Sequence, residues 1–175
     1  MGQFDHLVNS MTVPPPFHNN GRFYCDPFGC LAPLDAPWDG VIQQDMTNSI
    51  ATIALLVAEY DEAIEFYRDK AGFALLSDTD MGGGKRWVLV APPGGNGARL
   101  LLARADGPEQ RKAIGNQTGG RVMLFLETDD FSGTHAAMMA RGVRFLEAPR
   151  HEPYGSVAVF EDLYGNKWDL IEPRA

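Results

Sequence analysis

The sequence predicts an α+β domain built from two copies of a β-α-β-β-β module. Short apolar runs typical of strands surround only two segments with helical spacing. The order strand, helix and three strands occurs twice, and a glycine, Gly72 and then Gly142, follows each predicted helix. Each module must bury one face of its sheet. We therefore expect the two modules to form a curved mixed sheet around a cavity.

The first predicted module covers residues 50–104. Its opening run, IATIALLV, is apolar except for Thr52 and rich in branched side chains, as in a buried strand. Tyr60, Ile64 and Tyr67 then recur at helical spacing before Gly72 ends the helix. Strands are expected at 50–57, 73–80, 86–91 and 98–103, with glycine-rich hairpin turns between the last three.

The second predicted module covers residues 120–173 and repeats this order. Asp130 stands where a helix N-cap is expected, whereas the first helix has Glu59 there, whose longer side chain caps less well. A helix is expected from about Phe131 to Arg141, and strands at 122–128, 143–147, 156–161 and 166–171. The two modules together predict one domain over residues 46–175.

Residues 1–45 differ from the rest of the chain. They contain the run Pro14 to Pro16, further prolines and no sustained period of two or 3.6 residues. We interpret them as a mostly irregular, Pro-rich N-terminal extension. Met46 opens a stretch that leads directly into a strand, so it is a candidate alternative start, which the intact mass of natively expressed protein would decide.

Composition narrows the possible partners. The chain has 175 residues, a formal net charge of −8 and a pI near 4.9. Nucleic acid is therefore an unexpected partner, because its phosphates bind Lys and Arg.

No apolar run approaches the roughly 20 residues of a membrane-spanning helix. Only two cysteines, Cys25 and Cys30, are present. A cytoplasmic, reducing environment fits this composition.

Two segments resemble signatures of the vicinal oxygen chelate superfamily, which includes glyoxalases, bleomycin-resistance proteins and extradiol dioxygenases. YDEAIEFYRDKAGF at 60–73 is similar to its first helix, and FEDLYGNKWDLIEP at 160–173 to its closing hairpin. Leu163 stands where a proline is usual. The resemblance covers about residues 50–173, and it implies a small-molecule cavity and a homodimer.

Members of this superfamily hold a divalent metal with four strand residues, typically His, Gln or Glu. The resemblance places these positions at Thr52, Leu100, Met123 and Asp169. Only Asp169 is a conventional ligand, since an alkyl chain or a thioether cannot replace imidazole or carboxylate for a hard cation. We therefore expect no cofactor and no metal at these positions. A divalent metal held by a shifted ligand set is the alternative.

Asp169 is the main candidate for chemistry. Because side chains alternate along a strand, it points away from Trp168 and Leu170, toward the side where the resemblance implies the cavity. Burial would raise its pKa and suit it to proton transfer, whereas a nearby cation would make it an anchor for a cationic ligand. The structural alternative is an ion pair with Arg86, Arg99 or Lys167.

Weaker candidates lie near the expected cavity. His151 and Tyr154, in the predicted loop PRHEPYG, are candidate catalytic residues at its mouth, although a solvated loop explains them equally simply. Trp87 is a candidate for stacking on a ligand, and core packing is its alternative. Three further candidates have structural explanations: His135 on a helix, Trp168 in a strand and Glu127 at a strand end.

Three functions remain open. The favoured one is a metal-free protein that binds a small organic molecule, either to sequester it or in an uncharacterised reaction, with ligand-binding positions Thr52, Leu100, Met123, Trp87 and Asp169. A glyoxalase-like lyase or isomerase would use Asp169 as acid or base, assisted by His151 or Tyr154. A metal-dependent lyase, isomerase or dioxygenase is the third.

Overall fold

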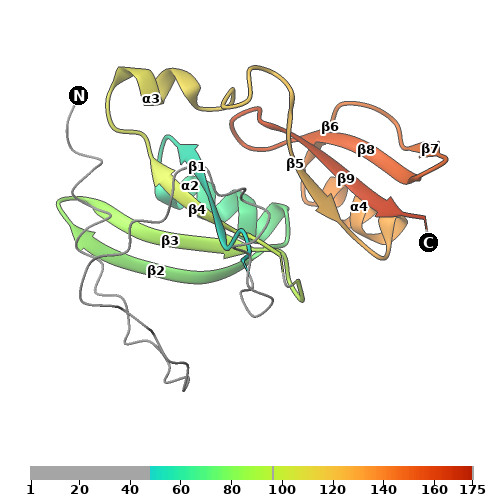
Figure 1. The fold of residues 1–175 in the computed structure, drawn as a ribbon, viewed down its shortest axis with the longest axis horizontal. Helices are drawn as coiled ribbons and strands as arrows, with labels where there is room; N and C mark the ends of the chain where they lie inside the picture. The colour runs from blue at the N-terminus through green and yellow to red at the C-terminus, as the bar shows by residue number, and fades with distance from the viewer. Residues whose placement is uncertain (1–47, 96, 175) are drawn as a thin grey trace, which may run out of the picture. The chain divides into compact units, whose positions relative to one another are not determined.

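The computed structural model describes residues 48–95 and 97–174 (Figure 1). The predicted Pro-rich extension, both cysteines and the candidate start at Met46 lie outside the described residues. Two modules of strand, helix and further strands follow one another, so the predicted α+β architecture is confirmed.

The first module forms a four-stranded mixed sheet, sheet A, in the order β1-β4-β3-β2. Strand β1 runs parallel to β4, and the other neighbours are antiparallel. The helix α2 continues as a π-helical segment, η2, which the sequence pattern did not predict. The elements are β1 (Thr52–Val57), α2 (Tyr60–Glu65), η2 (Phe66–Lys70), β2 (Ala74–Gly82), β3 (Lys85–Ala91) and β4 (Arg99–Arg104).

The second module forms the mixed sheet B, in the order β5-β9-β8-β6, with the short β7 also paired to β8. Strands β5 and β9 are parallel, as β1 and β4 are in sheet A. The predicted loop PRHEPYG is in part strand β7. The elements are β5 (Val122–Glu127), α4 (Phe131–Ala140), β6 (Arg144–Phe145), β7 (Arg150–Glu152), β8 (Gly155–Glu161) and β9 (Lys167–Pro173).

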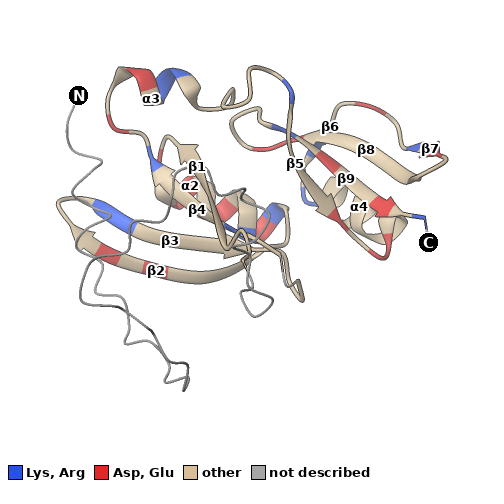
Figure 2. Cartoon of the chain, in the orientation of Figure 1, with Lys and Arg blue, Asp and Glu red and all other residues tan. Residues whose placement is uncertain are grey.

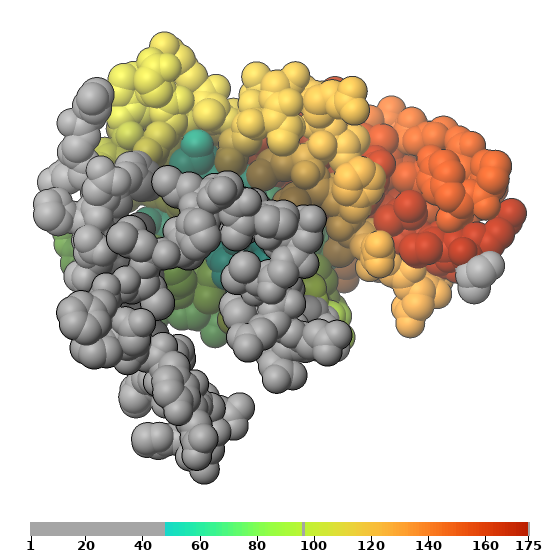
Figure 3. All heavy atoms as spheres, in the orientation of Figure 1, coloured from blue at the N-terminus to red at the C-terminus, as the bar shows by residue number. Residues whose placement is uncertain are grey.

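A linker with a short helix, α3 (Pro108–Ala113), joins the modules, and the sequence analysis did not predict this helix. In this linker the side-chain carbonyl oxygen of Gln117 accepts a hydrogen bond from the backbone N–H of Leu56 at 2.7 Å. The side-chain NH₂ group of Gln117 donates to the backbone carbonyl of Ala54 at 3.4 Å. This side chain therefore pairs with the free edge of β1. The linker is coloured yellow to amber in Figure 3. At Gly115 its backbone lies so close to the carbonyl oxygen of Tyr164, in the second module, that a Cβ atom would not fit between them.

One hydrophobic core is shared by the two modules. From sheet A it includes Leu55 and Val88, from the helical segments Tyr67 and Met138, and from sheet B Phe160, Trp168 and Leu170. Each sheet thus buries the face toward the helices, as alternating side chains require. We call the opposite face of each sheet, which points away from this core, its open face.

The predicted helix ends are confirmed. The Asp130 carboxylate accepts from the backbone N–H of Gly133 at 2.8 Å, whereas Glu59 makes no side-chain cap. Gly72 and Gly142 have φ angles of 82° and 83°, a left-handed conformation that glycine adopts without strain.

The turn between β8 and β9 is built around a buried carboxylate, Asp162, which is 6% exposed. It accepts from the Tyr67 hydroxyl at 2.7 Å, from the backbone N–H groups of Tyr164 and Asn166 at 2.9 Å, and from the Asn166 side chain at 2.8 Å. Burial, and then the charge of Asp162, raise the pKa of Tyr67 well above its ordinary value. This network joins the first helix to the closing hairpin.

Candidate functional site

The open face of sheet B is hollowed. The hollow has a volume of about 640 Å³, in the range of small-molecule sites. Polar and apolar side chains from β5, β8 and β9 and from the segment before β7 contribute to it. It is lined by Gly120, Arg121, Val122, Phe125, Leu146, Glu147, Val159, Lys167 and Asp169.

Asp169 lies on β9, across from Phe125 on β5 and Val159 on β8. Its atom Oδ1 is buried and has no hydrogen-bond partner among the described residues. Burial raises the pKa of this carboxyl above its ordinary value; nearby Arg150 lowers it and Glu147 raises it. Because an unpaired buried oxygen is costly, Asp169 is the polar group in this hollow with most to gain from a ligand.

Arg150 is held by two other carboxylates. Its Nε donates to Glu147 at 2.9 Å and its Nη1 to Glu152 at 2.7 Å, and Glu147 also accepts from the backbone N–H of Val159 at 3.3 Å. These bonds raise the pKa of Arg150 above its ordinary value. The guanidinium therefore influences Asp169 only through its charge. Figure 2 marks both basic and acidic positions on the ribbon of the second module.

Glu147 and Arg150 were missed in the sequence analysis. Arg150 pairs with Val157, which shares the open face with Asp169, because residues opposite each other in a sheet point to the same side. A period of two counted along PRHE would have found this signal, but the three polar residues Arg-His-Glu do not otherwise look like a strand.

His151 lies on the opposite side of sheet B from Asp169. His151 pairs with Ser156, and its Nδ1 lies 3.0 Å from the Ser156 hydroxyl. Ser156 is on the helix side of β8, so His151 points away from the face that carries Asp169. Tyr154 is 55% exposed in the turn after β7 and bonds to Arg174 through its backbone carbonyl. The expected catalytic group of Asp169, His151 and Tyr154 is therefore not assembled within the described chain.

The four positions implied by the resemblance are divided between the two sides of the sheets. Thr52 and Asp169 lie on open faces, but Leu100 is 4% exposed in the core and Met123 packs against the core beside a β-bulge. The position expected at Leu100 on the open face is therefore one residue off. Leu101, which pairs with Ala54, occupies the open face of sheet A instead.

The other candidate residues also lie partly on open faces and partly in the core. Trp87 lies on the open face of sheet A, because it alternates with the buried Val88. Trp168 is core, and His135 is enclosed between the rings of Phe131 and Phe145, so the structural explanations hold for both.

The alternative that Asp169 belongs to a structural ion pair finds no support in residues 48–174. Arg86 instead pairs with Asp78 and Asp61. Lys167 donates to the carbonyl of Gly120.

The donor set does not fit the superfamily's divalent metal. Among the described residues no group of three His, Cys, Asp or Glu side chains lies close enough to hold an ion. Apart from Asp169, the four matching positions offer a hydroxyl, an alkyl chain and a thioether, none of which replaces imidazole or carboxylate.

Comparison with known proteins settles the family. The family model described as Glyoxalase/Bleomycin resistance protein/Dioxygenase superfamily matches residues 49–170. The chain belongs to this superfamily. A protein of Shewanella frigidimarina (strain NCIMB 400) is 56% identical over 128 residues, covering 73% of this chain and 95% of the relative. YetH of Bacillus subtilis (strain 168) is 32% identical over 129 residues, covering 73% and 100%.

Solved structures of the superfamily share the fold. UcmS2 superposes with a TM-score of 0.63 at 27% identity, over 72% of this chain and 98% of that one. TnmS3, an antibiotic binding protein from Streptomyces sp. CB03234, has a TM-score of 0.59 at 29% identity, over 75% and 100%. In the described part of our chain, no helix is long and apolar enough to cross a membrane.

Proposed function

We propose that this protein binds a small organic molecule on the open face of sheet B, without the metal of its superfamily. The observation that carries the proposal is the half-buried carboxylate of Asp169 on the wall of a hollow of about 640 Å³, with one oxygen, Oδ1, buried and without a hydrogen-bond partner among the described residues. The absence of a fitting donor set in residues 48–95 and 97–174 supports a site without metal. TnmS3, which is 29% identical, is described as an antibiotic binding protein, and this supports a small organic ligand.

The chemistry of the hollow points to a ligand that donates a hydrogen bond. Burial makes the charged form of Asp169 costly, as its raised pKa records. A hydroxyl, amide or ammonium group on the ligand would offset this cost, and a charge-assisted hydrogen bond is about twice as strong as a neutral one. The side chains of Phe125, Leu146 and Val159 offer apolar contact to the rest of the molecule.

A metal-free enzyme is the second candidate, favoured by the same raised pKa. A carboxyl whose pKa is raised by burial is better suited to proton transfer than an ordinary Asp. In that case Asp169 would be the acid or base of a lyase or isomerase reaction. Asp169→Asn separates the two: a binding protein loses affinity, whereas an enzyme keeps binding its substrate and loses turnover.

A thermal-shift screen of small organic molecules tests the proposal. A ligand at about 100 times its Kd should stabilise the protein by about 2.7 kcal/mol. Asp169→Asn should abolish the shift for hits that donate a hydrogen bond, while Asp106→Asn, which changes an exposed carboxylate on the linker, should leave it intact. Hits that stabilise both variants equally would contradict the role of Asp169.

Metal analysis provides the complementary test. Purified protein should contain no stoichiometric Ni, Zn, Mn or Fe, and chelation should leave ligand binding unchanged. A stoichiometric metal whose removal abolishes binding would favour the metal-dependent alternative instead.

We also propose that a second copy of the chain covers the hollow. Within one chain both open faces point away from the shared core, and Phe125 on the open face of sheet B is 64% exposed.

Light scattering should give twice the mass of one chain for the wild type and the mass of one chain for Phe125→Glu. Met139→Glu, at an exposed apolar residue on α4, should remain dimeric. A monomeric wild type would contradict the proposal.

A further inference from the structure

The hollow on the open face of sheet B contains charges of both signs. Besides Asp169 and Glu147, its lining includes two basic residues, Arg121 and Lys167. In the part of the chain that the structure describes, neither basic side chain forms an ion pair with a carboxylate. Glu147, by contrast, is already paired with Arg150. Two cations in this hollow therefore have their charge available to a bound molecule.

The two basic residues lie together where the linker enters sheet B. Lys167 begins β9 and pairs with Val122 on β5, the residue that follows Arg121. The ammonium of Lys167 donates to the backbone carbonyl of Gly120 at 3.3 Å, which uses one of its three N–H bonds. The backbone at Arg121 is held as well, because the Thr118 hydroxyl donates to its carbonyl at 2.8 Å. These contacts form a basic end of the hollow.

Asp169 lies further along the same strand as Lys167. Side chains alternate along a strand, so these two residues share the open face at positions about 7 Å apart. Gly120 comes before the start of β5, whereas Phe125, which pairs with Asp169, lies further along β5. The ammonium of Lys167 therefore points away from Asp169. A molecule that contacts both groups must carry two different polar groups at opposite ends.

The surroundings of these charges favour a flat ligand with an acidic end. Phe125 lines the hollow beside Asp169 and is 64% exposed, so its ring is open to stacking. Glu161 lies opposite Lys167 on β8, but its carboxylate is paired with Arg144 at 2.9 Å. The charge of Glu161 is thus already balanced, and the basic end lacks an anion.

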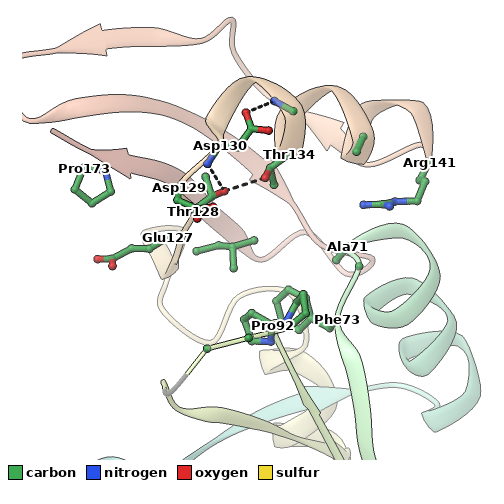
Figure 4. A pocket seen from close by; sticks show the side chains of 17 residues that line it. Ala71, Phe73, Pro92, Glu127, Thr128, Asp129, Asp130, Thr134, Arg141 and Pro173 are labelled. Atoms are coloured by element: carbon green, nitrogen blue, oxygen red, sulfur yellow. Dashed lines mark hydrogen bonds between the residues drawn. The ribbon is translucent and has the colours of Figure 1, made fainter. Parts of the chain in front are cut away.

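A larger cavity of about 910 Å³ beside α4 differs in this respect. Several of its polar side chains bond within the chain: Asp130 caps α4, and the hydroxyls of Thr128 and Thr134 lie 2.9 Å apart (Figure 4). Arg141, also in its lining, donates to the backbone carbonyl of Lys70 at 2.9 Å. The open-face hollow therefore offers a ligand the more specific set of polar contacts.

Building on the proposed function, we propose that the molecule bound in this hollow is an aromatic hydroxy acid, with a neutral hydroxyl at one end of its ring and a carboxylate at the other. The hydroxyl donates to Asp169, the ring packs against Phe125, and the carboxylate binds Lys167 and Arg121. Hydrogen bonds between ionised groups are stronger than neutral ones, and a guanidinium can hold a carboxylate through two parallel bonds. A neutral or cationic ligand would leave the basic end without an anion.

Three benzene derivatives form a matched set of probes. 4-Hydroxybenzoate carries both groups, and at pH 7 its carboxyl is ionised and its hydroxyl is neutral. 4-Hydroxybenzamide has the same hydroxyl without the charge, and benzoate has the charge without the hydroxyl. In NMR titrations of the full chain at low salt, 4-hydroxybenzoate should bind about five- to tenfold more tightly than either of the others. Its advantage over the amide should shrink at high salt, because dissolved ions screen exposed charges.

Variants of the two cations test their role. Arg121→Gln and Lys167→Gln should each reduce the preference for 4-hydroxybenzoate over 4-hydroxybenzamide by about two- to fivefold and leave the affinity for the amide unchanged. Lys167→Arg keeps the charge and should keep the preference. Arg111→Gln, at an exposed position of α3 outside the lining of the hollow, is the control and should change neither affinity.

The outcomes separate this inference from the proposed function. Equal affinities for 4-hydroxybenzoate and 4-hydroxybenzamide, with both weakened in Asp169→Asn, would overturn the aromatic acid and support the proposed site at Asp169. Binding of both hydroxylated probes that Asp169→Asn leaves unchanged would contradict the proposed function and this inference with it. A lack of 4-hydroxybenzoate binding at millimolar concentration would overturn the inference alone, because the thermal-shift screen tests the proposed function with other molecules.

Discussion

Two carboxylates on the closing hairpin have opposite surroundings. Asp162, in the turn between β8 and β9, is buried and accepts four hydrogen bonds. Asp169, seven positions later on β9, has a buried oxygen with no partner in the described chain and a pKa raised by burial. The hairpin thus carries one satisfied carboxylate and one unsatisfied carboxylate.

This difference separates a structural role from a binding role. A carboxylate whose acceptor sites are filled by the chain's own donors stabilises the turn and has little to offer a ligand. A carboxylate left unpaired beside a hollow gains most when a ligand supplies the donor. The two positions should therefore respond in opposite directions to loss of charge.

Asp162→Ala should have the largest effect. It leaves the Tyr67 hydroxyl, two backbone N–H groups and the Asn166 amide without their acceptor, so we expect a loss of about 3–5 kcal/mol in the free energy of unfolding. Urea denaturation followed by circular dichroism measures it. Asp106→Ala, at an exposed linker position, is the control and should cost less than about 0.5 kcal/mol. Similar costs for both variants would contradict the structural role of the turn.

Tyr67→Phe should have an intermediate effect. The hydroxyl donates one charge-assisted hydrogen bond to Asp162, which keeps its other three, so we expect a loss of about 1–2 kcal/mol. Tyr154→Phe, at an exposed ring, should be neutral. In the double variant with Asp162→Ala, the Tyr67→Phe change should add little, because the shared bond is already lost. Additive costs would show that the two groups act independently.

Asp169→Asn should have the smallest effect on stability, and of opposite sign. Because the folded-state pKa is raised, the folded protein binds a proton more readily than the unfolded chain. The wild type therefore loses stability as the pH rises from the ordinary Asp value through the raised one. At pH 7 the variant should be more stable by about 0.5 kcal/mol, and the difference should vanish below about pH 4. A variant that is less stable at pH 7 would indicate an unseen partner for Asp169.

Much of the fold was predictable because local signals agreed with it. The two glycine-ended helices, the Asp130 cap and the repeated order of elements are all confirmed. Strand β7 and helix α3 were missed. The three polar residues of β7 become a strand only by pairing with β8, which is a tertiary effect.

The site was less predictable than the fold. Asp169 was found through the resemblance to the superfamily, and the alternation of side chains along the strand then placed it on the face opposite Trp168 and Leu170. In ARLLLA, by contrast, either face could be the core, and only the pairing of β4 with β1 places Leu100 inside and Leu101 outside. Arg150 approaches Asp169 through the register of β7 on β8, and Glu147 through its bond to the backbone N–H of Val159; no local sequence pattern records either contact.

A crystal structure of the full chain, purified without added metal and soaked with the strongest screening hit, tests the central claim most directly. We expect an organic molecule in the open-face hollow of sheet B, with a donor atom within hydrogen-bonding distance of the Asp169 carboxylate. A metal ion bound there by three or more nitrogen or oxygen atoms of the protein would contradict it.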